Sequence, residues 1–445
     1  MNRNSEKHKK IVRQRIMTAV ITLLILGVVS VGIYYAAQIL LMKAKEQQQK
    51  TAEKEPVPQV AEETEKPENE PEIDWYVSEN EADPDTVSAP EISQEDQKVK
   101  ELIESMSLDE RICQLFIVKA DDLTGVENTT AARDATKAAL EKYPVGGIIY
   151  FEANIIDPDQ LGEMLKNTSE FAKELGMPPL FLCIDEENGS ITRIASNDKF
   201  DVPRFPSMYD MSLSDNAADT VYDAGLKTGS YLKEYGFNLN FAPVADVVTS
   251  SENSAIGTRS FGAEPDEVSK LSLQYAKGLE ESGIIPCFKH FPGLGDTETD
   301  THLGLASTRK TEKELDDSGF IPFANAAENG AKLIMAGHIS APLLTGDDTP
   351  SSLSDVMINA ILREKMGYDG VVITDSLQMK SVTDNYTVPE AVKMAIKAGA
   401  DIILMPEDLE SAVNALKDAV KTGEIKEERI DDSLQRILKL KLSLQ

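Results

Sequence analysis

The chain has 445 residues, 41% of them hydrophobic, and a formal net charge of −31 at pH 7. This length is enough for one large folded domain or for two to three ordinary ones. The strong acidity argues against a nucleic-acid-binding protein, which needs basic patches to contact phosphates, and it favours neutral or small ligands. The three cysteines, Cys113, Cys183 and Cys287, each lie inside an apolar run, so we expect buried thiols rather than disulfides.

The first 42 residues have the pattern of a membrane anchor. A basic tail at 1–15 precedes an uncharged stretch at 16–42, which includes ITLLILGVVSVGIYY. A transmembrane helix needs about 20 apolar residues. A cleaved signal peptide would have a shorter apolar region and a small-residue cleavage site, and neither is evident. We therefore expect a single-pass anchor at 16–42, with the tail in the cytoplasm and everything after Lys43 on the extracellular side.

The segment at 43–95 predicts an acidic, disordered linker. It is rich in Glu, Lys, Gln and Pro, as in TAEKEPVPQVAEETEKPENEPE, and it has few apolar residues to bury. The only tryptophan, Trp75, lies within it; it either packs on the folded domain or has no defined role. Such a linker holds a catalytic domain at 96–445 away from the membrane.

From about Gln97 onward, short apolar runs alternate with amphipathic helical stretches such as 157–176 and 264–283. Nearly continuous apolar runs are typical of parallel strands that are buried on both faces. Eight strands with intervening helices predict an α/β fold of the (β/α)8 TIM-barrel type. A doubly wound open sheet is the alternative, but VKADDLTG, after the first run, is not a glycine-rich phosphate loop. The eight predicted strands are 114–120, 146–151, 180–185, 237–244, 284–291, 331–338, 370–376 and 400–406.

Reactive side chains stand where several of these strands end, as expected for the catalytic face of such a barrel. Asp185 ends the third strand, Lys289 and His290 the fifth, His338 the sixth and Asp375 the seventh. A carboxylate at the position of Asp375 can attack an electrophilic carbon, or it can cap the following helix. His338 either lines the pocket or makes a structural hydrogen bond.

The stretch CFKHFPGLGDTETDTHLGLAST at 287–308 contains Asp300 and His302, two positions apart. At this spacing the carboxylate can accept a hydrogen bond from the imidazole, fix its tautomer and raise its pKa. A histidine supported in this way can protonate a leaving oxygen and later activate water. The alternative is a surface loop in which both residues are incidental.

Together these motifs resemble glycoside hydrolase family 3, and specifically its β-N-acetylhexosaminidase branch, over residues 97–440. KHFPGLGDTETDTH is similar to the K-H-F-P-G-x-G-x-x-x-x-D-[ST]-H signature of that branch. IDEENGSITR, AIGTRSFG and ITDSLQM resemble three further segments of the branch. The chain departs from the pattern at Asn188 and Ser190, which replace a glycine and an arginine, and at Leu294, where many relatives have histidine.

The resemblance implies a retaining double displacement in which Asp375 is the nucleophile and His302 is the acid/base, assisted by Asp300. It implies a small carbohydrate substrate with terminal β-linked N-acetylglucosamine, and no metal or organic cofactor. From the predicted topology we expect a peptidoglycan fragment as the natural substrate, and a chitin-type oligosaccharide stays open as an alternative. The residues implied to bind the sugar are Asp185, Arg193, Arg259, Lys289 and His290.

Other functions remain open on the sequence alone. A β-glucosidase of the same family would take its acid/base from a second domain, and only about forty residues follow the last strand. Phosphorolysis is compatible with a histidine acid/base. A Schiff-base lyase would use Lys289. A non-catalytic wall-binding module would bind sugar without turnover.

Overall fold

The computed structural model describes residues 93–249, 255–297 and 304–444, all within one compact unit, Ser88–Gln445. The predicted anchor at 16–42 and most of the predicted linker at 43–95 lie outside the described residues. Within those described ranges, no helix is both long enough and apolar enough to cross a bilayer. The described chain begins at helix α2 (Gln94–Ser105), which is capped by the Ser93 side chain.

Each of the eight predicted ranges contains a parallel strand, although the strands are shorter than the apolar runs. The fifth range is divided at Cys287 into two strands that pair with different neighbours. Two further short strands, β7 (Ala306–Ser307) and β9 (Ile339–Ser340), form a separate two-stranded sheet. The strands at the predicted positions are β1 (Phe116–Lys119), β2 (Gly147–Ile149), β3 (Phe181–Ile184), β4 (Leu239–Asn240), β5 (Ile285–Pro286), β6 (Phe288–Phe291), β8 (Leu333–Ala336), β10 (Val371–Thr374) and β11 (Ile403–Leu404).

These strands form a curled parallel sheet. One set of six has the order β11-β1-β2-β3-β4-β5, and a second set has the order β10-β8-β6. The first strand pairs with the last, with Phe116 opposite Ile403, so the sheet bends round on itself rather than opening into two separate edges. The architecture is therefore an α/β fold similar to a TIM barrel, and the doubly wound alternative is wrong.

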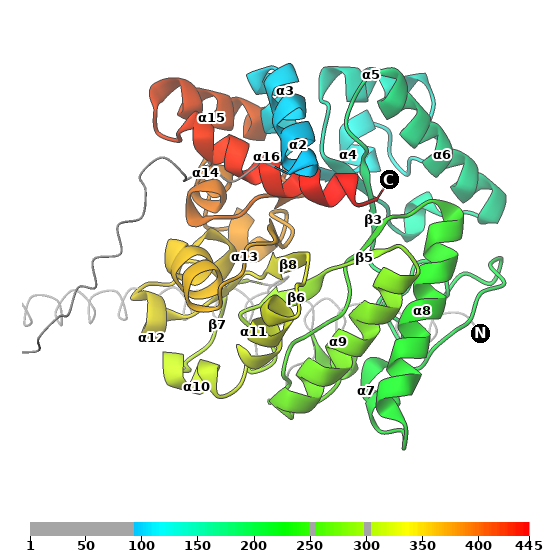
Figure 1. The fold of residues 1–445 in the computed structure, drawn as a ribbon, viewed down its shortest axis with the longest axis vertical. Helices are drawn as coiled ribbons and strands as arrows, with labels where there is room; N and C mark the ends of the chain where they lie inside the picture. The colour runs from blue at the N-terminus through cyan, green and yellow to red at the C-terminus, as the bar shows by residue number, and fades with distance from the viewer. Residues whose placement is uncertain (1–92, 250–254, 298–303, 445) are drawn as a thin grey trace, which may run out of the picture. The chain divides into compact units, whose positions relative to one another are not determined.

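Helices cover the outside of the curled sheet (Figure 1). The predicted helical stretches at 157–176 and 264–283 are α6 (Pro158–Glu174) and α9 (Pro265–Glu281), and each begins with a proline in its first turn. The remaining α-helices are α3 (Leu108–Cys113), α4 (Ala120–Thr124), α5 (Asp134–Lys142), α7 (Met208–Ser212), α8 (Ala217–Tyr235), α10 (Glu312–Asp316), α11 (Ile321–Glu328), α12 (Pro342–Thr345), α13 (Lys380–Thr383), α14 (Val388–Ala398), α15 (Leu409–Thr422) and α16 (Glu427–Leu442). Short 3-10 helices are η1 (Glu152–Asn154), η2 (Gly257–Arg259) and η3 (Ser351–Leu353), and η4 (Val356–Lys365) is a π-helix.

The close packing of α8 against α9 supports the loop that follows β3 (Figure 1). A Cβ at Gly225 would lie 2.3 Å from the Tyr275 carbonyl oxygen, and one at Gly278 would lie 2.4 Å from that of Tyr222. Only glycine allows the two helices to approach so closely. This approach brings the Tyr275 hydroxyl to the Glu186 carbonyl oxygen, to which it donates at 3.3 Å.

The three cysteines are buried and unpaired, as predicted. Burial raises the pKa of the Cys113 thiol to about 12 and the pKa of Cys183 well above its ordinary value. The thiols therefore stay neutral near pH 7, and because only the thiolate is a good nucleophile, these residues serve as core side chains and not as nucleophiles.

Candidate active site

Six of the eight predicted site residues line one cavity at the carboxyl ends of the strands. Asp185 directly follows β3, Lys289 and His290 lie in β6, and Asp375 directly follows β10. The carboxyl ends of parallel strands meet at one end of the sheet, which brings these side chains together. The cavity measures about 160 Å³ and is lined by Asp185, Glu187, Ile191, Arg193, Phe241, Ala255, Ile256, Arg259, Lys289, His290, Leu294, Met335, Asp375 and Leu404.

The other two predicted residues, Asp300 and His302, fall in the segment 298–303, outside the described residues. The chain on both sides of that segment is described. Thr308 Oγ1 donates to Asp296 Oδ2 at 2.6 Å, which ties the two flanks together. Leu294, earlier in the same motif, lines the cavity. The acid/base pair stays a prediction.

Lys289 is the centre of an ion-pair network under the cavity. Its side chain is only 3% exposed, and its Nζ lies 2.7 Å from Asp185 Oδ1 and 2.6 Å from Glu187 Oε1. Burial alone would lower the pKa of Lys289, but the charges of Asp185 and Glu187 raise it. The ammonium therefore stays charged, and it can donate to a sugar hydroxyl as well as to the two carboxylates.

Arg259 shares Glu187 with Lys289. Its Nε and Nη2 atoms approach the two oxygens of Glu187 at 2.7 and 2.8 Å, which is a bidentate pair. Burial opposes ionisation of Glu187, but Arg259 and Lys289 hold its pKa well below the usual range. Among the described residues, no group of three or more His, Cys, Asp or Glu side chains is arranged to hold a metal ion. The fixed charges of the network are suited to orienting a polyhydroxylated ligand.

Asp375 occupies a different environment from these paired carboxylates. Its Oδ1 accepts the backbone N–H of Ser376 at 2.7 Å, and α13 is capped by Met379, so Asp375 is not the helix cap. Burial disfavours the ionised form, yet the nearby charges of His338 and His290, together with the Ser376 amide, lower the pKa of Asp375. Asp375 is thus an ionised carboxylate at the cavity wall, as a nucleophile must be.

His338 is fully buried and makes hydrogen bonds next to Asp375. Its Nε2 donates to the Ser376 carbonyl oxygen at 2.8 Å, and its Nδ1 lies 2.7 Å from Ser352 Oγ. It does not line the cavity. Of the two alternatives for His338, the structural hydrogen bond is the one observed.

The loop that presents Arg193 is held by a buried carboxylate. Glu186 accepts the backbone N–H groups of Arg193, Ile194 and Ala195 at 2.6, 3.0 and 2.9 Å. The Arg193 guanidinium lies over the Phe151 ring, with Cζ 5.7 Å from the centroid. Its Nε is buried without a hydrogen-bond partner in the described part of the chain, so it is available to a ligand.

The three departures from the family pattern lie in different surroundings. Asn188 has φ +71°, a left-handed conformation that glycine prefers and asparagine tolerates. Ser190 is exposed beside the site. Leu294 packs in a small apolar cluster with Val244, Ile256 and Ile339.

Three acidic residues of this region were absent from the sequence prediction. Glu186 and Glu187 directly follow Asp185, and their roles depend on partners that are distant in sequence. Asp246 could have been found, because it follows the predicted fourth strand by two residues and so obeys the rule that selected Asp185 and Asp375. It is fully buried and bonds to His290 Nδ1 at 2.7 Å.

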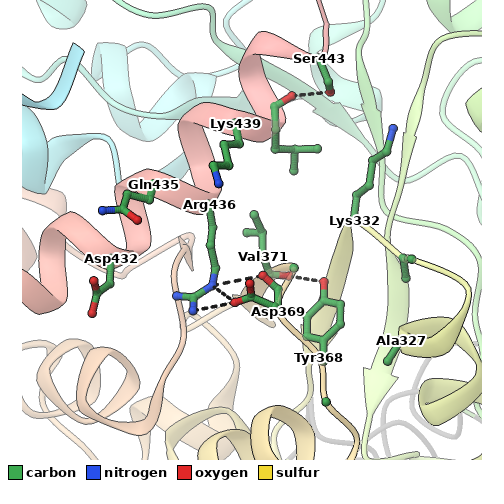
Figure 2. Close-up of a pocket in the computed structure, with 15 residues that line it drawn as sticks. Ala327, Lys332, Tyr368, Asp369, Val371, Asp432, Gln435, Arg436, Lys439 and Ser443 are labelled. Carbon is green, nitrogen blue, oxygen red and sulfur yellow. Dashed lines mark hydrogen bonds and ion pairs between the residues drawn. The ribbon is translucent and has the colours of Figure 1, made fainter. Parts of the chain in front are cut away.

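A larger groove, of about 560 Å³, lies at the opposite end of the strands (Figure 2). Lys332 immediately precedes β8, and Asp369 immediately precedes the turn into β10. Arg436 of α16 binds Asp369 at 2.9 Å, as the dashed lines in Figure 2 show. Residues at this end of a barrel usually contribute to stability rather than to catalysis.

Comparison with known proteins gives one consistent result. The model of the glycosyl hydrolase family 3 N-terminal domain matches residues 107–440. The β-hexosaminidase LpqI of Mycobacterium tuberculosis is 31% identical over 340 residues, which cover 75% of this chain and 82% of that protein. β-Hexosaminidase A of Pseudoalteromonas piscicida is 30% identical over 328 residues, which cover 68% of this chain and 54% of that protein.

Solved structures that resemble this chain belong to the same family. A family 3 β-N-acetylglucosaminidase from Paenibacillus sp. superimposes with a TM-score of 0.72 at 34% identity, over 76% of this chain and 63% of that chain. A family 3 member from Mycobacterium smegmatis has a TM-score of 0.66 at 29% identity and is matched over 97% of its length. The chain thus spans nearly all of some relatives and only somewhat more than half of others.

Proposed function

The chain belongs to glycosyl hydrolase family 3, and we propose that it removes terminal β-linked N-acetylglucosamine, with Asp375 as the nucleophile and His302, assisted by Asp300, as the acid/base. The observation that carries this proposal is the state of Asp375. Of the three carboxylates that line the cavity in the described chain, Asp185 and Glu187 are paired with cations, whereas Asp375 forms no ion pair and keeps its negative charge. A free, ionised carboxylate is what attack on an anomeric carbon requires.

The mechanism follows from these positions. A carboxylate oxygen of Asp375 attacks the anomeric carbon and breaks its bond to the leaving oxygen, which takes a proton from His302. The product is a covalent glycosyl-enzyme and a free alcohol. A water molecule then gives its proton to His302 and attacks the same carbon, which releases the sugar and restores the Asp375 carboxylate.

The sugar is held by the charged network. Asp185 accepts from hydroxyl groups, while Lys289, Arg259 and Arg193 donate to them. Because Lys289 and Arg259 are themselves fixed by Glu187, their donors are already oriented when the sugar arrives. The name of the Paenibacillus enzyme, a β-N-acetylglucosaminidase, supports N-acetylglucosamine as the sugar in this position, and LpqI is named more broadly as a β-hexosaminidase.

The two parallel sheets are parts of one (β/α)8 barrel in this proposal. Isolated parallel bridges join Val244 to Lys289 and Ile373 to Ile402, next to the pairs β4–β6 and β10–β11. Both outer strands of the three-stranded sheet, β6 and β10, therefore have a neighbour in the six-stranded sheet. An experimental structure with an open edge at β6 or β10 would contradict this closure.

The natural substrate in this proposal is a peptidoglycan fragment outside the cell, with 16–42 as the membrane anchor. The anchor pattern and the acidic linker support this placement. Fractionation of cells that express the full chain should find it in the membrane, where external protease should release the domain at 96–445. Recovery of the uncleaved chain in the cytosol would contradict the placement.

The nucleophile is tested by covalent trapping. The full-length protein is incubated with a 2-fluoro sugar bearing a good leaving group, and the labelled peptide is identified by mass spectrometry. We expect the label on Asp375, and no label in Asp375→Ala. Borohydride reduction with a carbonyl substrate would instead label Lys289 in a Schiff-base lyase. Labelling at any other carboxylate would overturn the assignment.

A further inference from the structure

Asp246 is a buried carboxylate that contacts the sugar-binding site from behind. It follows β4 and is 0% exposed. Its Oδ2 lies 2.7 Å from His290 Nδ1, and its Oδ1 accepts the backbone N–H of Leu294 at 2.6 Å. A carboxylate that deeply buried is costly unless its oxygens are hydrogen-bonded, and here both are.

We propose that Asp246 is a positioning residue for catalysis, which fixes a proton of His290 on Nδ1 and leaves Nε2 of the ring to meet the sugar. The inference rests on the proposed function, because the reaction assigned to Asp375 is what His290 would assist. Asp246 itself does not line the cavity; it acts through His290 and Leu294, which do.

The hydrogen-bond pattern fixes the tautomer. An ionised carboxylate can only accept, so the Nδ1 atom that faces Asp246 must carry a proton. The other ring nitrogen, Nε2, has no hydrogen-bond partner in the described part of the chain, and the ring lines the cavity. Nε2 is therefore the atom of His290 that meets a sugar hydroxyl.

His290, which Asp246 holds in place, lines the same cavity as Asp375. Although burial raises the pKa of Asp375, the charges of His338 and His290 lower it. The ring that Asp246 holds is thus one of the two imidazoles next to the nucleophile. Other charged groups around His290 in the same cavity are Asp185, Glu187, Arg193, Arg259 and Lys289.

Asp246 also joins two parts of the KHFPGLG motif. Through one carboxyl group it holds the ring of His290 and the backbone of Leu294, four residues further along the chain. The position of the His290 ring relative to the backbone at Leu294 is thus fixed by one carboxyl group. A neutral amide in place of the carboxylate cannot satisfy both donors in the same way.

Asp246→Asn is the decisive variant because it keeps the side-chain shape and removes the charge. We expect the asparagine oxygen to accept from Leu294 and its NH₂ group to donate to His290 Nδ1, which moves the ring proton to Nε2. The kcat/KM for p-nitrophenyl N-acetyl-β-glucosaminide should fall about 10–100-fold.

Nitrogen-15 NMR of the full-length protein labelled at histidine distinguishes the two tautomers. The chain has four histidines, so the His290 signal can be assigned by its loss in His290→Gln. In the wild type we expect a protonated Nδ1; an Nδ1 without a proton would overturn the proposal even if Asp246→Asn did not fold. A folded Asp246→Asn protein with lower activity and an unchanged His290 tautomer would show a structural role only.

Asp401→Asn is the matched control. Asp401 is also 0% exposed and paired with a cation, Arg363, but it lies at the opposite end of the strands. It should lower stability without changing the His290 tautomer. If the wild type does not hydrolyse the glucosaminide, the proposed function fails, whereas the tautomer measurement still tests the link between Asp246 and His290.

Discussion

The two ends of the curled sheet both bury charged side chains, but they use them differently. At the amino-terminal end of the strands, Asp401 accepts from Arg363 Nη2 at 2.6 Å and from Ser433 Oγ at 2.8 Å. Two further arginines, Arg429 and Arg436, lie within 3.7 Å of it. At the carboxyl end, Asp375 accepts one backbone N–H and forms no ion pair in the described chain.

This difference separates charge that stabilises the fold from charge that is kept for a reaction. A buried carboxylate surrounded by donors contributes to a unique structure and has no lone pair left for a ligand. A carboxylate with one fixed donor and several cations at a distance stays ionised and keeps an oxygen for attack. Replacement of the carboxylate by a neutral group should therefore lower activity at the carboxyl end and lower stability at the amino-terminal end.

The largest expected effect is the loss of activity in Asp375→Asn. Removal of the nucleophile should reduce kcat by about 10⁴-fold or more. The midpoint of urea unfolding should stay near that of the wild type, because Asp375 forms no ion pair with any residue of the described chain. Asp401→Asn should do the reverse: it leaves buried arginines without their partner and should cost about 3–5 kcal/mol of unfolding free energy. Equal loss of stability in both variants would remove the distinction.

Lys289→Met should affect both activity and stability. The substitution leaves Asp185 and Glu187 without their shared cation, and a broken buried ion pair costs about 3–5 kcal/mol. It also removes a donor to the sugar, so kcat/KM should fall even in molecules that stay folded. Urea unfolding and assay at a temperature far below the melting point separate the two effects. Lys332→Met, a lysine of the opposite groove, is the control and should change neither by much.

Lys441 shows how a buried cation behaves without a carboxylate. It is 0% exposed, its Nζ donates to Gln114 Oε1 at 2.7 Å, and it lies 5.0 Å from the centre of the Phe181 ring. Burial lowers its pKa to about 7. The unfolded chain, with a lysine pKa of about 10.4, therefore binds a proton that the folded chain lacks between about pH 7 and 10.

Lys441→Met should consequently stabilise the protein most at or below pH 7, by a few kcal/mol, where the wild type buries the charged form. The advantage should shrink by about 1.4 kcal/mol per pH unit above pH 7. Urea unfolding between pH 6 and 8 tests this below the range in which unfolded cysteines begin to ionise. A constant difference across this range would show that Lys441 does not change its protonation on folding.

Most of the fold and the framework of the site could be predicted because both follow from local rules. Apolar runs located the strands, and the rule that catalytic groups follow strand ends selected Asp185, Lys289, His290 and Asp375. Glu187 was missed because its importance comes from Arg259, which is distant in sequence. Partner choice depends on how the chain closes in space, which no single segment encodes.

The smallest expected effect concerns Asn188, which lies at the carboxyl end without lining the cavity. Its side chain donates to the Tyr275 hydroxyl at 3.0 Å and accepts from Thr228 Oγ1 at 3.3 Å, and its φ is +71°. Asn188→Gly loses these bonds but relieves the left-handed backbone, so stability should change by less than about 1 kcal/mol. Asn188→Ala loses the same bonds and adds strain, so it should cost about 1–2 kcal/mol more than the glycine variant. Both should keep kcat/KM within a few-fold of wild type, and equal stabilities would show that the hydrogen bonds, not the backbone, favour asparagine here.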